Sequence, residues 1–267
     1  MVFVKSPKKS LGQNFLIDKN IIKKILNISN IDENQTILEI GAGYGNLTEL
    51  IAKKKVKKII AVEKDIQICE FLKNNFKNNK NIKIINDDIL NVIKKINFGK
   101  NIIVFGNLPY NISTKILSSL ILTKKWPPWY KSLIFMFQKE VADRISAKTN
   151  SKEFGRLTVL ANWRLDIKKH FNVSNNCFYP RPKVDSTVLS FIPKKDIFKI
   201  KNPKNLEKVT RILFSSRRKM INKSFIKLFN GDKSIAKKLD LNLNLRPGEI
   251  NNEMYYKITL QYENLTY

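Results

Sequence analysis

An uncharged stretch, Asn107-Leu108-Pro109-Tyr110, directly follows an apolar run in a chain whose net charge is +28. The Asn107 amide oxygen and the Leu108 carbonyl oxygen are hydrogen-bond acceptors. Pro109 restricts the residue before it to an extended backbone, which fixes where the Leu108 carbonyl points. Tyr110 offers a ring on which a base can stack. Two acceptors beside a ring suit an aromatic amine that is held by both of its amino hydrogens.

A glycine-rich turn follows the apolar run 36–40, with glycines at 41, 43 and 45. Glycine is used where a backbone turns sharply or approaches a ligand without a Cβ in the way. Asn46 stands where a dinucleotide fingerprint has Gly or Ala, so the pyrophosphate-binding version fits poorly. Acidic residues end the next two apolar runs; these are Glu63, then Asp87 and Asp88. Glu63 can accept hydrogen bonds from two ribose hydroxyls, whereas Asp88 alone fits a helix N-cap equally well.

Carboxylates repel phosphates, so a nucleoside that carries a positive centre is the better ligand for this set of residues. S-adenosylmethionine is that molecule. The aromatic amine of a target adenine base is a poor nucleophile because its lone pair is delocalised into the ring. Acceptors such as Asn107 and the Leu108 carbonyl would let the nitrogen direct its lone pair at a sulfonium methyl, by orientation and electrostatic preorganisation.

The elements that position these residues alternate between short apolar runs and amphipathic stretches, which is typical of a parallel sheet covered on both faces. Strands are predicted at 36–40, 58–63, 82–86, 101–106 and 132–137, with later β-rich runs at 157–171 and 186–192. Helices are predicted at 46–54, 65–77, 112–122 and 139–147. A further helix is expected from about Asp18, whose side chain can cap it.

The apolar spacing becomes helical after Pro193, without a convincing strand. This change divides the chain into a Rossmann-like α/β domain at 1–194, which includes a basic N-terminal segment at 1–17, and a small helical domain at 195–267. We expect the helical domain to bind RNA or the ribosome. Arg217-Arg218-Lys219 fall on a predicted helix in it, and such a cluster suits phosphates.

Composition narrows the functional classes. The net charge of +28 favours a polyanionic partner such as nucleic acid, although a surface that is merely rich in Lys is the alternative. Two cysteines and a single histidine argue against a disulfide framework, a metal centre and Ser-His catalysis in this chain. No apolar run approaches the roughly 18 residues of a membrane helix, so a cytoplasmic protein without membrane contact is expected.

These motifs resemble the ribosomal RNA adenine N6,N6-dimethyltransferases of the small subunit, over nearly the whole chain. The matching segments are LGQNFL (11–16), LEIGAGYGNLT (38–48), VEKD (62–65), VFGNLPYNIST (104–114), FQKEV (137–141), FGRLTV (154–159), FYPRPKVDS (178–186) and SRRK (216–219). The resemblance implies a class I methyltransferase fold, with a Rossmann-like, seven-stranded and mostly parallel sheet and a small C-terminal α-helical domain. It also implies dimethylation of two adjacent adenosines near the 3′ end of 16S ribosomal RNA, on an immature 30S subunit, by a monomer.

The resemblance also implies roles for individual residues. It assigns the cofactor contacts to Asn14, Leu16, Gly41, Glu63, Asp88 and Asn107. Asp88 is favoured over Asp87 by one register only. Residues 107–110 would hold the target amine, and Phe178 would face Tyr110 across the adenine. Arg217, Arg218 and Lys219 are expected to dock on ribosomal RNA.

Other functions fit parts of the pattern. The large-subunit adenine methyltransferases of the macrolide-resistance type share the fold and an NxPY motif, although the FGRLTV, PKVDS and SRRK segments favour the small-subunit type. The chain could also act chiefly as an assembly checkpoint that binds immature subunits. A DNA-directed amino methyltransferase uses a similar acceptor motif, and a dehydrogenase fits the glycine turn alone.

Overall fold

The computed structural model describes residues 7–8, 11–95 and 98–266, so residues 1–6 and 9–10 of the predicted basic N-terminal segment lie outside the described residues. The chain forms two compact units. The first comprises 1–117, 127–142 and 167–193, and the second comprises 118–126, 143–166 and 194–267. The second unit therefore includes two segments that the sequence placed in the first domain.

The first unit is built on a sheet that has seven strands within the described residues, in the order β4-β3-β2-β5-β6-β9-β7. Their bounds are β2 Thr36–Ile40, β3 Lys58–Glu63, β4 Ile82–Asn86, β5 Ile102–Asn107, β6 Tyr130–Gln138, β7 Leu165–Val173 and β9 Ser186–Pro193. The pairs β2–β3, β3–β4, β2–β5 and β5–β6 are parallel, and β6–β9 is antiparallel. The predicted α/β fold with a mostly parallel sheet is confirmed.

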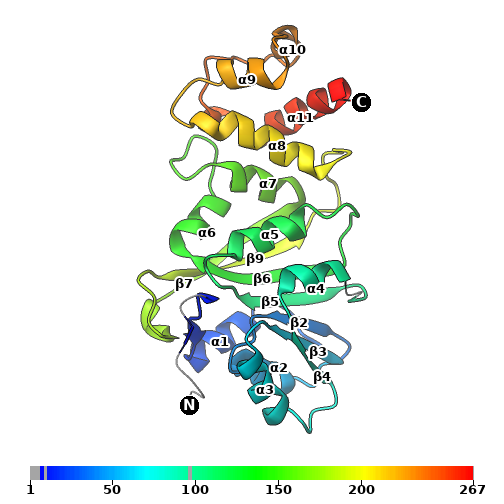
Figure 1. Ribbon diagram of the computed structural model, residues 1–267, viewed down its shortest axis with the longest axis vertical. Helices are drawn as coiled ribbons and strands as arrows, with labels where there is room; N and C mark the ends of the chain where they lie inside the picture. The colour runs from blue at the N-terminus through cyan, green and yellow to red at the C-terminus, as the bar shows by residue number, and fades with distance from the viewer. Residues whose placement is uncertain (1–6, 9–10, 96–97, 267) are drawn as a thin grey trace. The chain divides into compact units, whose positions relative to one another are not determined.

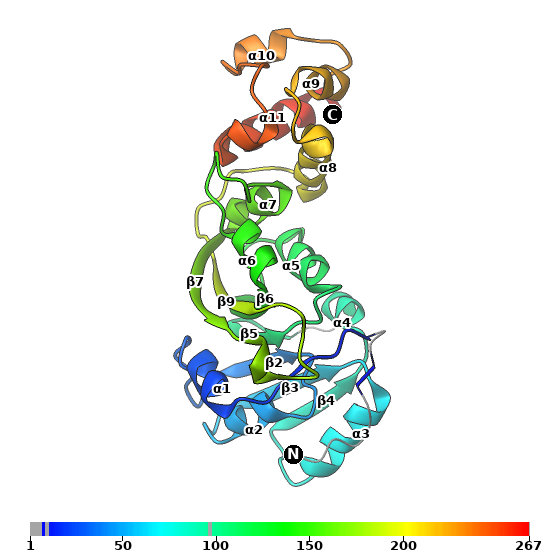
Figure 2. The same ribbon diagram turned by 90° about the vertical axis from the view of Figure 1, so that its left-hand side faces the viewer.

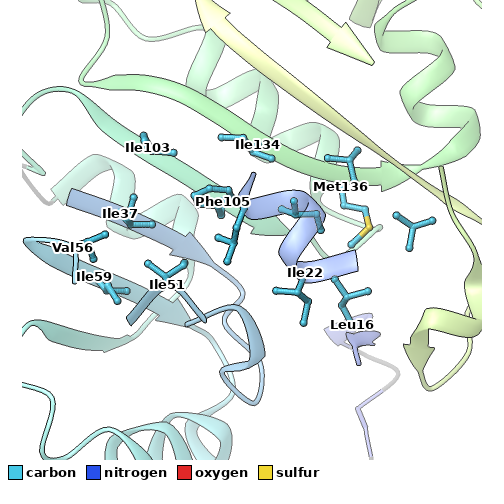
Figure 3. Packing of buried hydrophobic residues seen from close by; sticks show 14 of the residues in the cluster. Leu16, Ile22, Ile37, Ile51, Val56, Ile59, Ile103, Phe105, Ile134 and Met136 are labelled. Carbon is cyan, nitrogen blue, oxygen red and sulfur yellow. The ribbon is translucent and has the colours of Figure 1, made fainter. Parts of the chain in front are cut away.

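Helices cover both faces of this sheet (Figures 1 and 2). Their bounds are α1 Lys19–Leu26, α2 Asn46–Ala52, α3 Ile66–Asn75, α4 Ile89–Lys95, α5 Ser113–Ile121 and α6 Lys139–Ile145. Figure 3 shows Ile22 of α1 and Ile51 of α2 packed with Ile37 and Phe105 of the sheet, and all four are buried. Because alternate side chains of a strand share a face, this packing fixes which side chains of β2 and β5 turn toward α1 and α2.

A second, two-stranded sheet joins the N-terminal segment to a distant loop. Strand β1, Phe15–Leu16, pairs antiparallel with β8, Phe178–Tyr179. Asp18 then caps α1, since its carboxylate accepts hydrogen bonds from the backbone nitrogens of Asn20 and Ile21 at 2.8 and 3.1 Å. The predicted cap is confirmed.

The predicted β-rich run at 157–171 is wrong in its first half, because Arg156–Arg164 forms helix α7 and β7 begins only at Leu165. Six of the nine residues of α7 are buried, so its sequence lacks the alternation of apolar and polar faces that reveals a surface helix. The Thr158 hydroxyl closes the first turn, where it accepts a hydrogen bond from the Gly155 backbone nitrogen at 3.1 Å.

The remaining helices belong to the second unit. They are α8 Pro203–Leu213, α9 Asn222–Leu228, α10 Ser234–Lys238 and α11 Asn252–Thr266, with short 3-10 turns η3 Phe214–Ser216 and η4 Pro247–Glu249; a further 3-10 turn in the first unit, η2, spans Asn175–Cys177. The buried Glu263 carboxylate of α11 accepts hydrogen bonds from the backbone nitrogens of Lys201 and Asn202 at 2.9 and 2.8 Å, which ties α11 to the start of α8. In the part of the chain that is described, no helix combines the length and apolar character needed to cross a bilayer.

The predicted helical position of the cationic cluster at 217–219 is wrong. These residues lie in a turn between η3 and α9. The Arg217 guanidinium donates hydrogen bonds to the backbone carbonyls of Lys152 and Phe154, the latter at 2.8 Å. These long-range bonds hold the turn in place within the second unit.

Candidate active site

A cavity of about 130 Å³ lies at the carboxyl ends of the parallel strands of the first unit. Its wall is formed by the glycine turn, the ends of β3 and β5, the start of α4 and the N-terminal residues 11–15. Five of the six residues predicted to bind the cofactor line it: Asn14, Gly41, Glu63, Asp88 and Asn107. Leu16 is instead buried in the core cluster and lines a second, smaller cavity.

The glycine turn is closed by the side chain of Glu63. Its Oε2 accepts a hydrogen bond from the Gly43 backbone nitrogen at 3.0 Å, and its Oε1 accepts from the backbone nitrogens of Lys64 and Asp65, both at 2.9 Å. Burial raises the pKa of Glu63 above its ordinary value, while the backbone hydrogen bonds act in the opposite direction. Since each carboxylate oxygen has two acceptor sites, Oε2 can accept one more hydrogen bond from a ligand.

Two glycines of the turn have no room for a side chain. Gly43 has a φ of 53°, and a Cβ there would lie 2.9 Å from the ring of Phe15. Gly45 has a φ of 83°, and a Cβ there would lie 2.9 Å from the side chains of both Leu72 and Phe76. The turn therefore requires glycine both for its left-handed backbone and for its close packing.

Asp87 and Asp88 both line the larger cavity. Asp87 accepts hydrogen bonds from the Asp88 backbone nitrogen at 2.6 Å and from Asn91 at 3.1 Å. Asp88 caps α4 through the Leu90 nitrogen at 2.9 Å and pairs with Lys64 at 3.0 Å. Burial raises the pKa of Asp88, but the Leu90 hydrogen bond and the Lys64 ammonium outweigh this effect, so the pKa lies below its ordinary value. Asp88 is thus an ionised wall residue and a helix cap at once.

The side-chain amide of Asn107 has a defined orientation. Its Nδ2 donates a hydrogen bond to the backbone carbonyl of Asn14 at 2.9 Å. A carbonyl oxygen only accepts hydrogen bonds, so the amide nitrogen must be the atom that faces Asn14, and Oδ1 is left to act as an acceptor toward a ligand. Leu108 is buried, with its side chain folded back beneath Gly106. Pro109 follows on the cavity wall.

Tyr110 is half-buried and held at both ends. Its hydroxyl lies 2.6 Å from the Ser186 hydroxyl, and its carbonyl accepts a hydrogen bond from Ser113 at 3.2 Å. Burial raises the pKa of the Tyr110 phenol, although the Ser186 hydrogen bond lowers it. The ring is therefore neutral near pH 7 and fixed in position.

Phe178 and Tyr179 occupy opposite sides of β8. Phe178 is 3% exposed and belongs to the core cluster that includes Leu16, whereas Tyr179 is 44% exposed. Adjacent residues of a strand point to opposite faces, which explains the difference. That Phe178 faces Tyr110 across an adenine stays a prediction. Sequence analysis missed the exposed Tyr179 ring, although the segment FYPRP places this second aromatic residue directly after Phe178.

A second residue that sequence analysis missed is Glu39, an acid within the apolar strand β2. It lines the smaller cavity of about 50 Å³, which shares Gly41, Gly43 and Asn107 with the larger one. The Thr48 hydroxyl donates to Glu39 at 2.5 Å. Burial raises the pKa of Glu39 to about 8, the Thr48 hydrogen bond lowers it, and the Glu63 charge adds to the increase. Glu39 is therefore mostly protonated near neutral pH, and the smaller cavity contains no full negative charge.

The strand order and the glycine turn after β2 define a class I methyltransferase fold. A solved dimethyladenosine transferase from Plasmodium falciparum has the same fold with a TM-score of 0.77, at 26% identity over 93% of this chain and 97% of that one. The 23S rRNA methyltransferase ErmE also shares the fold, with a TM-score of 0.66 at 18% identity, covering 93% of this chain and 99% of that one.

The family follows from the sequence comparison. The ribosomal RNA adenine dimethylase model matches residues 4–263, and the chain belongs to this family. A protein of Pelagibacter ubique named ribosomal RNA small subunit methyltransferase A is 51% identical over 99% of both chains. A protein of the same name from Borreliella burgdorferi is 40% identical over 95% of this chain and 88% of that protein. The resemblance noted in the sequence is confirmed.

We predict that Glu39→Gln changes how stability depends on pH. A carboxyl whose pKa is about 8 when folded and 4.5 when unfolded binds an extra proton in the folded state between these values. The wild type should therefore lose stability relative to Glu39→Gln as the pH rises from 5 to 8, by up to about 1.4 kcal/mol per pH unit. Urea unfolding of both proteins at several pH values measures this difference, and parallel curves would contradict it.

We further predict that the two residues of β8 differ in their effect on stability. Phe178→Ala should lower the free energy of unfolding by about 3–5 kcal/mol, because it opens a cavity in the core. Tyr179→Ala should lower it by less than about 1 kcal/mol, since much of that ring is already in water. Urea unfolding followed by circular dichroism compares them. Equal losses would show that the alternation across β8 is incorrect.

Proposed function

We propose that this protein is a ribosomal RNA adenine dimethyltransferase, which uses S-adenosylmethionine to dimethylate N6 of two adjacent adenosines near the 3′ end of 16S ribosomal RNA. The orientation of the Asn107 amide is the observation that carries the proposal. It supplies an acceptor next to a cavity whose charged wall residues are mainly acidic, and that combination suits an amine acceptor beside a cationic methyl donor. The names of the curated relatives support the small subunit as the target.

The cavity residues suit S-adenosylmethionine better than a phosphorylated nucleotide. Glu63 has one acceptor site left on Oε2 for a ribose hydroxyl, and Asp87 and Asp88 lie where an adenine amine could donate. Lys64, which also lines the cavity, is paired with Asp88 at 3.0 Å and so offers little charge to a phosphate. We therefore assign cofactor binding to Asn14, Gly41, Glu63, Asp88 and Asn107, and an indirect contribution to Leu16, which holds the segment after Asn14 in the core.

The chemistry needs orientation more than a strong base. When bound, S-adenosylmethionine supplies an electrophilic methyl group on a sulfonium. The Asn107 Oδ1 and the Leu108 carbonyl accept the two amino hydrogens of adenine, which turns the nitrogen lone pair toward the cofactor. Pro109 fixes the Leu108 carbonyl, and the immobilised Tyr110 ring stacks on one face of the base. Phe178 covers the other face in this proposal, which requires the entering adenine to contact a ring that is now buried.

The same pocket must act twice on each adenosine. In each transfer the nitrogen bonds to the methyl carbon as the C–S bond of the sulfonium breaks, and the nitrogen then releases one proton to water. After the first transfer the amine has one hydrogen left, so only one of the two acceptors is still engaged. The apolar walls near Asn107, which include Ile134 and Met136 of the smaller cavity, can accept the first methyl group without burying an unpaired donor. We propose that the protein does this in the cytoplasm as a monomer, without a metal ion, and that its substrate is an immature 30S subunit.

The helical unit is proposed to dock the enzyme on ribosomal RNA. Arg218 and Lys219 are exposed, whereas Arg217 already donates to two carbonyls of its own unit. Arg217 therefore shapes the turn, and its two neighbours are the cations presented to phosphates. Docking on ribosomal RNA is expected both of an enzyme and of an assembly checkpoint. A variant that loses methylation but still binds the subunit would therefore separate the two functions.

Mass spectrometry of small-subunit RNA after incubation with isotopically labelled S-adenosylmethionine tests the proposed function. Dimethyladenosine should appear on immature small subunits, at a higher level than on DNA or on large-subunit RNA. Asn107→Ala should lower the rate by at least about 100-fold, because it removes an oriented acceptor from the transition state. The matched control is Asn78→Ala, which changes an exposed asparagine of the same unit. Monomethyl product alone from the wild type would contradict the double transfer.

The docking role is tested with two double variants. Arg218→Ala with Lys219→Ala should weaken binding to the immature subunit and reduce the slope of log affinity against log salt by about 1 to 2, as expected when two phosphate contacts are lost. The control is Lys237→Ala with Lys238→Ala, which removes the same charge from the exposed side of α10. Filter binding at several salt concentrations measures both. Equal slopes for the two variants would overturn the role of Arg218 and Lys219.

A further inference from the structure

A carboxylate next to the cofactor cavity has more hydrogen bonds than its helix requires. Asp65 caps α3 by accepting a hydrogen bond from the Gln67 nitrogen at 3.1 Å. It also pairs with the Lys8 ammonium, at 3.0 Å from Oδ1 and 2.9 Å from Oδ2, and accepts a hydrogen bond from the Gln13 amide at 3.1 Å. The Asp65 side chain is 3% exposed and that of Lys8 is 43% exposed. The ion pair is therefore mostly shielded on its acidic side.

Lys8 and Gln13 are also joined to each other. The Lys8 backbone nitrogen donates to the Gln13 side-chain oxygen at 2.7 Å. The Gln13 side chain thus uses its oxygen toward Lys8 and its nitrogen toward Asp65, which closes a small network among Lys8, Gln13 and the start of α3. Burial raises the pKa of Asp65, but the hydrogen bonds from Lys8, Gln13 and Gln67 outweigh it, so the pKa lies below its ordinary value. The carboxylate stays ionised across the physiological range.

The segment held by this network forms part of the cavity wall. Residues 11–14, the N-terminal segment, line the larger cavity together with Glu63 and Asp88. The segment is attached at its other end as well, where the Asn14 carbonyl accepts the hydrogen bond from Asn107. Between these two points Gly12 has a φ of 64°, and a Cβ there would lie 3.2 Å from Asn111. The segment is thus fixed between Asp65 on one side and the amide of Asn107 on the other.

We propose that Lys8 and Asp65 are positioning residues for the methyl donor, because their ion pair keeps the N-terminal segment folded against the cofactor cavity. The inference rests on the proposed function. If the segment were free, the cofactor would have to order it on binding, and the apparent Kd would rise by the inverse of the fraction of molecules in which the segment is in place. Loss of the ion pair would also leave the Asn14 carbonyl less fixed in position, and this carbonyl orients the Asn107 amide.

The contacts suit this role better than a purely structural one. Leu11, Gly12 and Gln13 are only partly buried, so they add little to the hydrophobic core. The Lys8 ammonium is half-exposed, and an ion pair with one partner in water contributes little to global stability. Its effect should instead appear where the segment contacts a ligand. Cofactor affinity should therefore respond to the ion pair, and the unfolding midpoint should not.

The test is isothermal titration of the full chain with S-adenosylmethionine. Lys8→Met should raise the Kd by about 3- to 10-fold, equivalent to about half to one unit of log affinity. Lys8→Arg, which keeps the positive charge, should have a Kd within about twofold of the wild-type value. The matched control is Lys53→Met, which breaks the exposed pair with Glu49 at 2.7 Å, and it should leave the Kd unchanged. The urea midpoints of all four proteins should agree.

Asp65→Asn provides the second side of a double-mutant cycle. Asn keeps the cap on α3 but loses the ion pair. The double variant with Lys8→Met should therefore have a Kd for S-adenosylmethionine no higher than that of the single variant that binds less tightly. Additive losses, or an unchanged Kd for Lys8→Met, would overturn the proposal. A fall in affinity that is matched by a fall in the urea midpoint would also overturn it. If the wild type itself fails to bind S-adenosylmethionine, the proposed function fails, which is a separate result.

Discussion

The proposed cofactor cavity depends on the carboxylate of Glu63 and its three hydrogen bonds from backbone nitrogens. These bonds join the glycine turn, through Gly43, to the first residues after β3, through Lys64 and Asp65. A buried carboxylate is costly to desolvate, and backbone N–H groups are donors that cannot move away or be titrated. The result is a rigid corner between two parallel strands. Because Asp65 begins α3, the same corner also sets where the helix starts and where the N-terminal segment can be held.

Acidic groups near the cavity differ in charge although the chain as a whole is strongly basic. Backbone donors and one lysine each hold the pKa values of Asp88 and Asp65 below their ordinary values, so both carboxylates are ionised. Glu39, on the other side of the turn, is fully buried with a hydroxyl as its partner, and it is mostly protonated near pH 7. The larger cavity therefore has a negative wall, and the wall of the smaller one is mostly apolar and contains no full negative charge. A cationic sulfonium is favoured in the first, and an uncharged methyl group or base edge in the second.

Sequence patterns predicted the parts of the site that depend on strand ends. Glu63 and Asn107 end parallel strands, and Gly41 and Asp88 follow parallel strands. Parallel strands place their carboxyl ends at one edge, so the common location of these residues follows from the order of the elements alone. The prediction failed where burial removes periodicity, as in α7, or where a long-range contact decides the backbone, as at Arg217. Leu16 and Phe178 were visible as motif residues, but their burial depends on the pairing of two-residue strands 162 positions apart, which no local pattern encodes. The ion pair between Lys8 and Asp65 was missed for the same reason.

In the proposed reaction, the amide of Asn107 is a neutral residue that accepts hydrogen bonds from the target amine beside a cationic methyl donor. A carboxylate at this position would accept hydrogen bonds from the amine more strongly. It would also attract a proton or the sulfonium itself, and it would then no longer be oriented toward the amine. A basic residue could not accept a hydrogen bond at all. An amide accepts without a net charge, and its direction has to come from its other end, where Nδ2 is fixed to the Asn14 carbonyl. The segment before β1 is therefore as much a part of the proposed amine-binding pocket as the strand that carries Asn107.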